Sequence, residues 1–345
     1  MTIPLALIAA IVTVDLAPEP DLHLGPLLIV APAITASFAG PWLVAAVGLL
    51  AVAGEVITSL GVQEKDRNAQ VAAVVLISAF IVFYSLLRDR GRRELSEVRL
   101  VADAVQRVLM RPLPERIGPL RIASLYLTAE REAQVGGDLY AVARIDAGTR
   151  LIIGDVRGKG LTAIDTTAQV LGAFRAAAHQ RATLPDLVVF LDNVAGVEPS
   201  RPDEPDTGVE ESFVTSAVLD IPDDGSTVQI INRGHPPPLL VRDGQVTELR
   251  ASRPAPPLGL GALAPAGHEV DAFRFAAGDL LLLYTDGVIE ARDARGGFYP
   301  LAERVAAWAE QDPARLVQRL HDDLLAHAGG RLDDDVAVVA VERQG

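Results

Sequence analysis

Cysteine is absent from this 345-residue chain. Without it the protein cannot form disulfides, thiolate zinc sites or iron–sulfur clusters, which excludes the cysteine-dependent phosphatases and proteases as well. Basic charge is also scarce, because 31 Lys and Arg residues stand against 45 Asp and Glu residues and give a formal net charge of −14. Such an acidic chain repels phosphate backbones, so the composition argues against a nucleic-acid-binding protein.

Charged residues are few in the segment 1–87, which contains only two basic and six acidic side chains. Its apolar runs cover about 2–17, 26–38, 41–60 and 70–87. The last two runs approach the ~20 residues that a helix needs to cross the hydrocarbon of a bilayer, and the first two are shorter. The clustering of these runs before a polar region predicts a membrane region of about four helical spans, rather than the buried core of a soluble bundle.

Arginine is concentrated just after the fourth run, at Arg88, Arg90, Arg92 and Arg93. Basic residues flank membrane spans on the cytoplasmic side. We therefore expect a multi-pass protein of the cell membrane, in contact with the lipid bilayer, whose remaining chain is cytoplasmic.

The segment 93–110 is predicted to be an amphipathic helix, because apolar residues such as Val98, Val101 and Val105 recur at three- to four-residue spacing. It is either a linker helix packed on the next domain or a surface through which two copies of the chain form a homodimer. The sequence thus predicts a transmembrane region (1–87), a juxtamembrane linker helix (88–117) and a soluble domain (118–345).

From residue 118 onward, strands cluster with few helices between them, which favours antiparallel sheets of the α+β class over a doubly wound parallel fold. The predicted strands are 120–128, 139–145, 151–156, 213–219, 228–232, 239–241, 280–284 and 336–341, and the predicted helices are 163–179, 184–194, 301–308 and 313–327.

Aspartates stand at the ends of these strands in glycine-rich settings, in Gly136-Gly137-Asp138, Gly154-Asp155, Asp286-Gly287 and Asp333-Asp334-Asp335. Several such strand ends can meet in one cleft, where the carboxylates repel one another unless a cation neutralises them. Oxygen ligands without cysteine and with little histidine select a hard ion, Mg²⁺ or Mn²⁺. Each motif alone is a weak signal, since Asp-Gly is usually a turn.

The order of these motifs resembles the metal-dependent PP2C-type (PPM) serine/threonine phosphatases, in their bacterial SpoIIE/RsbU-like branch. The resemblance covers about 118–343 and rests on the segments 135–140, 154–160, 213–215, 232–239, 284–291 and 334–337. It implies a sandwich of two antiparallel β-sheets flanked by α-helices, with two Mn²⁺ or Mg²⁺ ions at one edge. Arg157 departs from the pattern, because the branch often has serine there.

The same resemblance implies the roles of the site residues. Asp155 matches a carboxylate that bridges both ions, and Val156 matches a backbone carbonyl ligand. Asp286 and Asp334 each match a ligand of one ion, with Asp335 as the alternative to Asp334 in the alignment. Asp138 matches an acidic residue beside the ions, and His235 and Lys159 remain open between a chemical and a structural role.

Together these observations predict a membrane-anchored, Mn²⁺- or Mg²⁺-dependent protein serine/threonine phosphatase in which a metal-activated water attacks phosphorus. By resemblance alone, its substrate is a phosphorylated protein similar to an anti-anti-sigma factor. Two alternatives stay open at this point. One is a catalytically silent membrane receptor or scaffold that keeps the fold, and the other is a hydrolase of small phosphate esters.

Overall fold

The protein is described by a computed structural model that covers residues 2–15, 24–61, 64–129, 136–158, 161–196, 213–261, 269–308 and 310–345, without the side chains of 2, 61–66, 92–108 and 161. The chain divides into two compact units, Met1–Val98 and Arg99–Gly345. The division falls inside one long helix, α4 (Glu64–Leu109). The backbone of the predicted 93–110 helix is thus confirmed as the end of α4, whereas most of its apolar stripe lies outside the described side chains.

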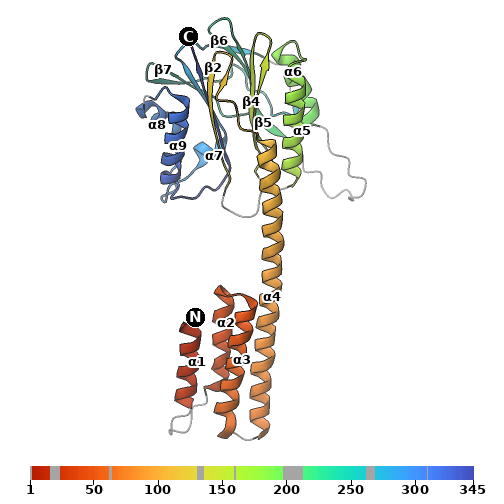
Figure 1. Cartoon of the computed structure of the whole chain (residues 1–345), viewed down its shortest axis with the longest axis vertical. Coiled ribbons are helices and arrows are strands. Elements are labelled where there is room, and N and C mark those ends of the chain that lie inside the picture. The colour runs from red at the N-terminus through yellow and green to blue at the C-terminus, as the bar shows by residue number, and fades with distance from the viewer. Residues whose placement is uncertain are drawn as a thin grey trace. The chain divides into compact units, whose positions relative to one another are not determined.

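The N-terminal unit is helical (Figure 1). It contains α1 (Thr2–Asp15), η1 (Gly25–Ile29), α2 (Val30–Phe38), α3 (Pro41–Thr58), η2 (Ser59–Gly61) and the first part of α4. Among the described residues, two segments are long and apolar enough to cross a membrane, Pro41–Thr58 and Arg67–Gly91. The expectation of about four spans is therefore corrected to two candidates. The reason is length, because the 14 residues of α1 extend about 21 Å against a hydrocarbon core of about 30 Å.

The C-terminal unit is built on two antiparallel sheets, as the sequence predicts. The first, called the β10 sheet, has the order β1-β2-β11-β10-β7-β8, and the second, the β4 sheet, has the order β3-β4-β5-β6-β9. The strands are β1 (Arg116–Ile117), β2 (Leu120–Leu127), β3 (Asp138–Ile145), β4 (Gly148–Val156), β5 (Val214–Pro222), β6 (Thr227–Arg233), β7 (Leu239–Arg242), β8 (Gln245–Glu248), β9 (Asp271–Arg274), β10 (Leu280–Tyr284) and β11 (Val336–Arg343).

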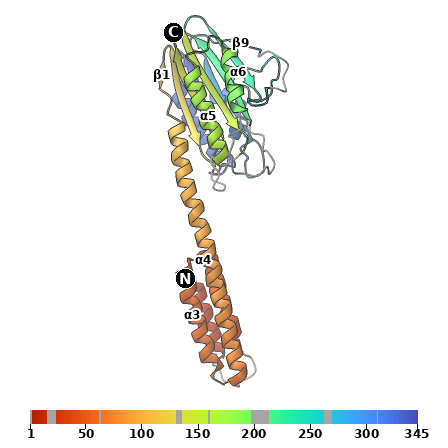
Figure 2. The same ribbon diagram turned by 90° about the vertical axis from the view of Figure 1, so that its right-hand side faces the viewer.

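Helices cover the outer faces of both sheets and complete the α+β sandwich. The β4 sheet is covered by α5 (Leu161–Ala177) and α6 (Leu184–Ala195), which lie in front of it in Figure 2. The β10 sheet is covered by α8 (Leu301–Trp308) and α9 (Pro313–His327). A short helix, α7 (Asp286–Glu290), begins directly after β10.

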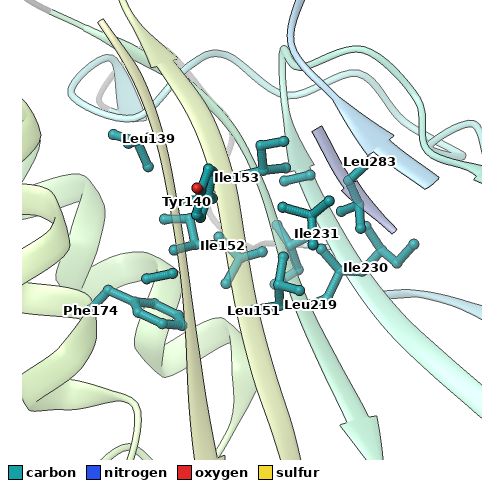
Figure 3. Packing of buried hydrophobic residues seen from close by; sticks show 14 of the residues in the cluster. Leu139, Tyr140, Leu151, Ile152, Ile153, Phe174, Leu219, Ile230, Ile231 and Leu283 are labelled. Carbon is teal, nitrogen blue, oxygen red and sulfur yellow. The ribbon is translucent and has the colours of Figure 1, made fainter. Parts of the chain in front are cut away.

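The central strands are buried on both faces, which explains their continuous apolar sequence. On β10, Leu281 and Leu283 point into the core between the sheets, and Leu282 points toward the α8–α9 side. On the opposite side of the β4 sheet, Phe174 of α5 packs in the same cluster as Ile152 of β4 (Figure 3). This two-sided packing fixes the register of the central strands, because a shift by one residue would exchange their two faces.

Phe174 should be a main contributor to the attachment of α5, because its side chain is fully buried. We expect Phe174→Ala to lower the free energy of unfolding by about 3–5 kcal/mol. Phe298→Ala is the matched control, since 57% of Phe298 is exposed, and its effect should stay near 0.5 kcal/mol. Urea unfolding of the full chain in detergent, followed by circular dichroism, measures both, and equal effects would contradict the packing described.

Candidate metal centre

The predicted aspartates come together because the strand registers place their ends side by side. In the β4 sheet, Asp138 at the start of β3 pairs directly with Asp155 near the end of β4. In the β10 sheet, Tyr284 pairs with Val338, and the backbone N–H of Thr285 donates to the carbonyl of Ala337 at 3.0 Å. This pairing brings the start of α7, with Asp286, next to the loop that precedes β11, with Asp333–Asp335. Both sheets therefore deliver carboxylates to the same edge.

These side chains line a cavity of about 370 Å³, called here the acidic pocket. Five aspartates line it, namely Asp155, Asp286, Asp333, Asp334 and Asp335, together with Ala129, Gly136, Gly137, Val156, Arg157, Gly158, Phe213 and Thr215. Asp138 does not line the pocket, and only 2% of it is exposed. The structure thus gathers the sequence-predicted residues, with Asp138 buried beside the pocket rather than facing it.

The glycines of the motifs let the backbone lie close to the acidic side chains of the site. A Cβ on Gly137 would lie 2.4 Å from the carbonyl oxygen of Val156 and 2.7 Å from Oδ1 of Asp155. A Cβ on Gly136 or Gly287 would collide with Asp335. None of these three glycines has a positive φ. Gly287 is therefore needed for the absence of a side chain, which leaves room for Asp335, and not for a left-handed backbone conformation.

Thr285 links the two sheets through the buried Asp138, and sequence reasoning did not single it out. Its hydroxyl donates to Oδ2 of Asp138 at 2.7 Å and accepts from the backbone N–H of Ala337 at 2.9 Å. The two hydrogen bonds connect β3 of one sheet to β10 and β11 of the other. The only feature of the sequence that could have indicated this role is a hydroxyl residue between the apolar strand and Asp286-Gly287.

Asp334 and Asp335 have different surroundings. Asp335 is 5% exposed and accepts from the Ala129 N–H at 2.7 Å and from the Tyr126 hydroxyl at 3.2 Å. Asp334 is exposed, and its Oδ1 accepts from the Asp335 N–H at 2.9 Å. Asp335 therefore anchors the loop, whereas Asp334 presents its carboxylate to the pocket.

Negative charge is concentrated at this edge. Burial first, and then the charge of Asp155, raise the pKa of Asp138 well above its usual range, against the opposing hydrogen bond from Thr285. Burial and the charge of Asp334 likewise raise the pKa of Asp286. Both carboxylates thus resist ionisation where they stand. A bound cation would favour the ionised form of both carboxylates and so lower their pKa values.

The donor set fits a hard divalent ion. The donors are carboxylate oxygens and the Val156 carbonyl, and no histidine lines the described pocket. Among the described residues, no three acidic or histidine side chains are already close enough together to hold an ion. The chemistry of the donors therefore suits Mg²⁺ or Mn²⁺, and the ion would have to draw the side chains together.

His235 does not line the acidic pocket and is 6% exposed. Its backbone N–H and carbonyl are both bound by the Asn232 side chain at 2.9 Å, and its Nδ1 lies 3.4 Å from the Thr215 hydroxyl. Burial lowers the pKa of His235 to about 3. The imidazole is thus neutral at physiological pH, which favours the structural role over proton donation. Lys159 lies outside the described residues.

The comparisons with known proteins agree with the two-sheet fold. The family model of stage II sporulation protein E (SpoIIE) matches residues 145–344. Protein IcfG of Synechocystis is 21% identical over 84% of this chain, which spans 49% of IcfG. The solved RsbU and RsbW domains of Rv1364c from Mycobacterium tuberculosis are 28% identical, with a TM-score of 0.53 over 65% of this chain and 60% of theirs.

The solved PP2C domain of SpoIIE from Bacillus subtilis, with a fragment of its regulatory domain, is 18% identical. It has a TM-score of 0.52 and covers 65% of this chain and 64% of that structure. At this identity the likeness concerns the fold, and the fold is the two-sheet sandwich described above. This chain thus spans about half to two thirds of the length of these relatives.

Gly137→Ala should weaken metal binding, because the new methyl group would displace the Val156 carbonyl or the Asp155 carboxylate. We expect the apparent Kd for Mn²⁺, measured by calorimetry on the full chain, to rise about tenfold or more. Gly172→Ala on the exposed face of α5 is the control, since its Cβ would meet no atom within 4 Å. Equal Mn²⁺ affinity in the two variants would show that close approach at Gly137 is not needed.

Proposed function

The chain belongs to the SpoIIE family, and from this premise we propose that it is a membrane-anchored, metal-dependent protein serine/threonine phosphatase. The observation that carries the proposal is the acidic pocket, in which both sheets deliver carboxylates to one edge. A catalytically silent scaffold has no need of this costly concentration of charge. The PP2C-type fold around the pocket supports the same reaction class.

Two Mn²⁺ or Mg²⁺ ions, when bound, would supply a water of lowered pKa and positive charge opposite the phosphoryl oxygens. Asp155, the Val156 carbonyl, Asp286 and Asp334 would hold them. Asp335 fixes the loop that carries Asp334, through its bonds to Tyr126 and Ala129. Asp138, held by Thr285, lies beside Asp155, where bound cations would favour its ionised form. The chain's own contribution is therefore to position these oxygens on rigid strand ends.

The proposed substrate is a phosphoserine or phosphothreonine of a regulatory protein, similar to an anti-anti-sigma factor. Its support is the relatives, whose names include stage II sporulation protein E and a chain with RsbU and RsbW domains. The neutral, buried His235 offers no ready proton for the departing alkoxide, so a water molecule would be the proton donor.

Membrane anchoring rests on the apolar surface of the N-terminal unit. Exposed fractions reach 87% for Trp42, 70% for Leu76 and 65% for Phe80. These residues lie on the two candidate spans, Pro41–Thr58 and Arg67–Gly91. Large apolar side chains facing outward along such helices are typical of a lipid-facing surface. Arg88 and Arg90 at the end of the second span would face the cytoplasm, and with them the phosphatase domain.

The decisive test is hydrolysis by the full chain in lipid nanodiscs. Wild type should release phosphate from a phosphoserine protein in Mn²⁺, should lose activity in EDTA, and should act more slowly on a small aryl phosphate. Asp155→Asn should lower kcat/KM by about a hundredfold or more with an unchanged circular dichroism spectrum. Asp165→Asn on the exposed side of α5 is the matched control.

Each competing function gives a distinct result in this assay. A silent scaffold would show no release with any metal. A small-ester hydrolase would prefer the aryl phosphate. Near wild-type turnover of Asp155→Asn in Mn²⁺ would refute its placement at the metal centre.

Asp334→Asn and Asp335→Asn should separate the two adjacent aspartates. Asp334→Asn should raise the Mn²⁺ concentration needed for half-maximal activity with little change in stability, because it removes charge from an exposed ligand. Asp335→Asn should also lower the urea midpoint, because Asp335 is buried and accepts two hydrogen bonds. The opposite pattern would mean that Asp335 is the ligand.

A further inference from the structure

Among the described residues that line the acidic pocket, Arg157 is the one with a positive charge. It follows the end of β4, and its side chain is exposed. The guanidinium carbon lies 5.0 Å from the centroid of the Phe213 ring. The Arg157 N–H also donates to the Phe213 carbonyl at 2.8 Å. Backbone and side chain together therefore hold this cation against one wall of the pocket.

The guanidinium of Arg157 forms no ion pair within the described part of the chain, although five aspartates line the same pocket. Other arginines of the domain are paired, as in Arg150 with Asp220 and Arg233 with Asp192, each at 3.0 Å. Stacking on an aromatic ring uses the face of a guanidinium and leaves its N–H edge available. Within the part of the chain that the structure describes, the N–H donors of the Arg157 guanidinium thus form no ion pair and lie beside the proposed reaction centre.

We propose that Arg157 binds the phosphoryl oxygens of the substrate phosphoserine or phosphothreonine and so holds the phosphate against the acidic pocket. The inference rests on the proposed function. A phosphate dianion approaching this pocket meets several carboxylates, and a fixed cation at the wall offsets part of that repulsion. The planar fork of arginine matches two phosphoryl oxygens, which a lysine or serine at this position cannot do.

A different role for Arg157 would be to neutralise the aspartates themselves. In that case its removal would change the affinity for Mn²⁺, because the negative charge of the pocket would rise. A role in substrate binding predicts instead a change in phosphate affinity at unchanged Mn²⁺ affinity. The two roles are thus separated by measuring each affinity.

The experiment compares wild type, Arg157→Ala, Arg157→Lys and Phe213→Leu as full chains in nanodiscs with saturating Mn²⁺. We expect Arg157→Ala to raise both KM for a phosphoserine peptide and the inhibition constant for inorganic phosphate by about ten- to a hundredfold. Arg157→Lys should restore part of this loss and Phe213→Leu should show an intermediate effect. Arg181→Ala is the matched control, because Arg181 stacks on Phe190 at 4.5 Å away from the residues that line the pocket.

The inference is overturned if Arg157→Ala leaves the phosphate inhibition constant unchanged, or if it changes Mn²⁺ affinity by a similar factor. Direct calorimetry of inorganic phosphate binding to the Mn²⁺-loaded protein covers the case in which no phosphopeptide is hydrolysed. Phosphate binding that depends on Arg157 would then sustain the inference while the proposed activity fails. Hydrolysis with the same KM in wild type and in Arg157→Ala would support the proposed activity and refute the role of Arg157.

Discussion

Repulsion between carboxylates gathered at one edge of the sandwich is the constraint to which much of the phosphatase domain responds. Asp138 and Asp155 are paired across β3 and β4, and the acidic side chains after β10 and before β11 lie at the same edge. The fold must hold these groups together even without a counter-ion. It does so through hydrogen bonds to individual carboxylates, among them the bonds from Thr285 to Asp138 and from Ala129 to Asp335, each of 2.7 Å.

The sheets supply the rigidity that this arrangement needs. β10 and β11 are buried on both faces, between the inter-sheet core and the helices α8 and α9. A strand packed on both sides cannot shift by one residue without exchanging its two apolar faces. The positions of Asp286 and of Asp335 are therefore set by packing that extends far from the site. Because this packing lies away from the site, the edge of the sandwich can hold several carboxylates that would destabilise a less constrained loop.

Much of the catalytic domain could be predicted from the sequence, because its central strands and long helices have strong local patterns. The continuous apolar run before Asp286 predicts a buried strand from its own residues. The Asp-Gly and Gly-Asp pairs at strand ends likewise indicate an acidic site from sequence alone. Thr285 could not be predicted in the same way, because its partner Asp138 is 147 residues away in the chain. The short edge strands β8 and β9 were also missed, since their half-exposed sequences resemble loops. The count of about four spans was wrong because the first two apolar runs form helices of fewer than 18 residues, too short for a span, within the described part of the chain.

The pair Asp334 and Asp335 shows why adjacent residues of the same type need a structure to be told apart. The sequence offers three aspartates in a row and no feature that ranks them. The difference arises from the partners that each finds in space, since Tyr126 lies in β2 and Ala129 follows it, both more than 200 positions earlier. Those donors bind both oxygens of Asp335 and draw it inward. Asp334 is left exposed at the surface of the pocket, where under the proposed function it would bind a cation. The two positions thus carry the same side chain and differ in burial, since Asp335 is buried and Asp334 is exposed.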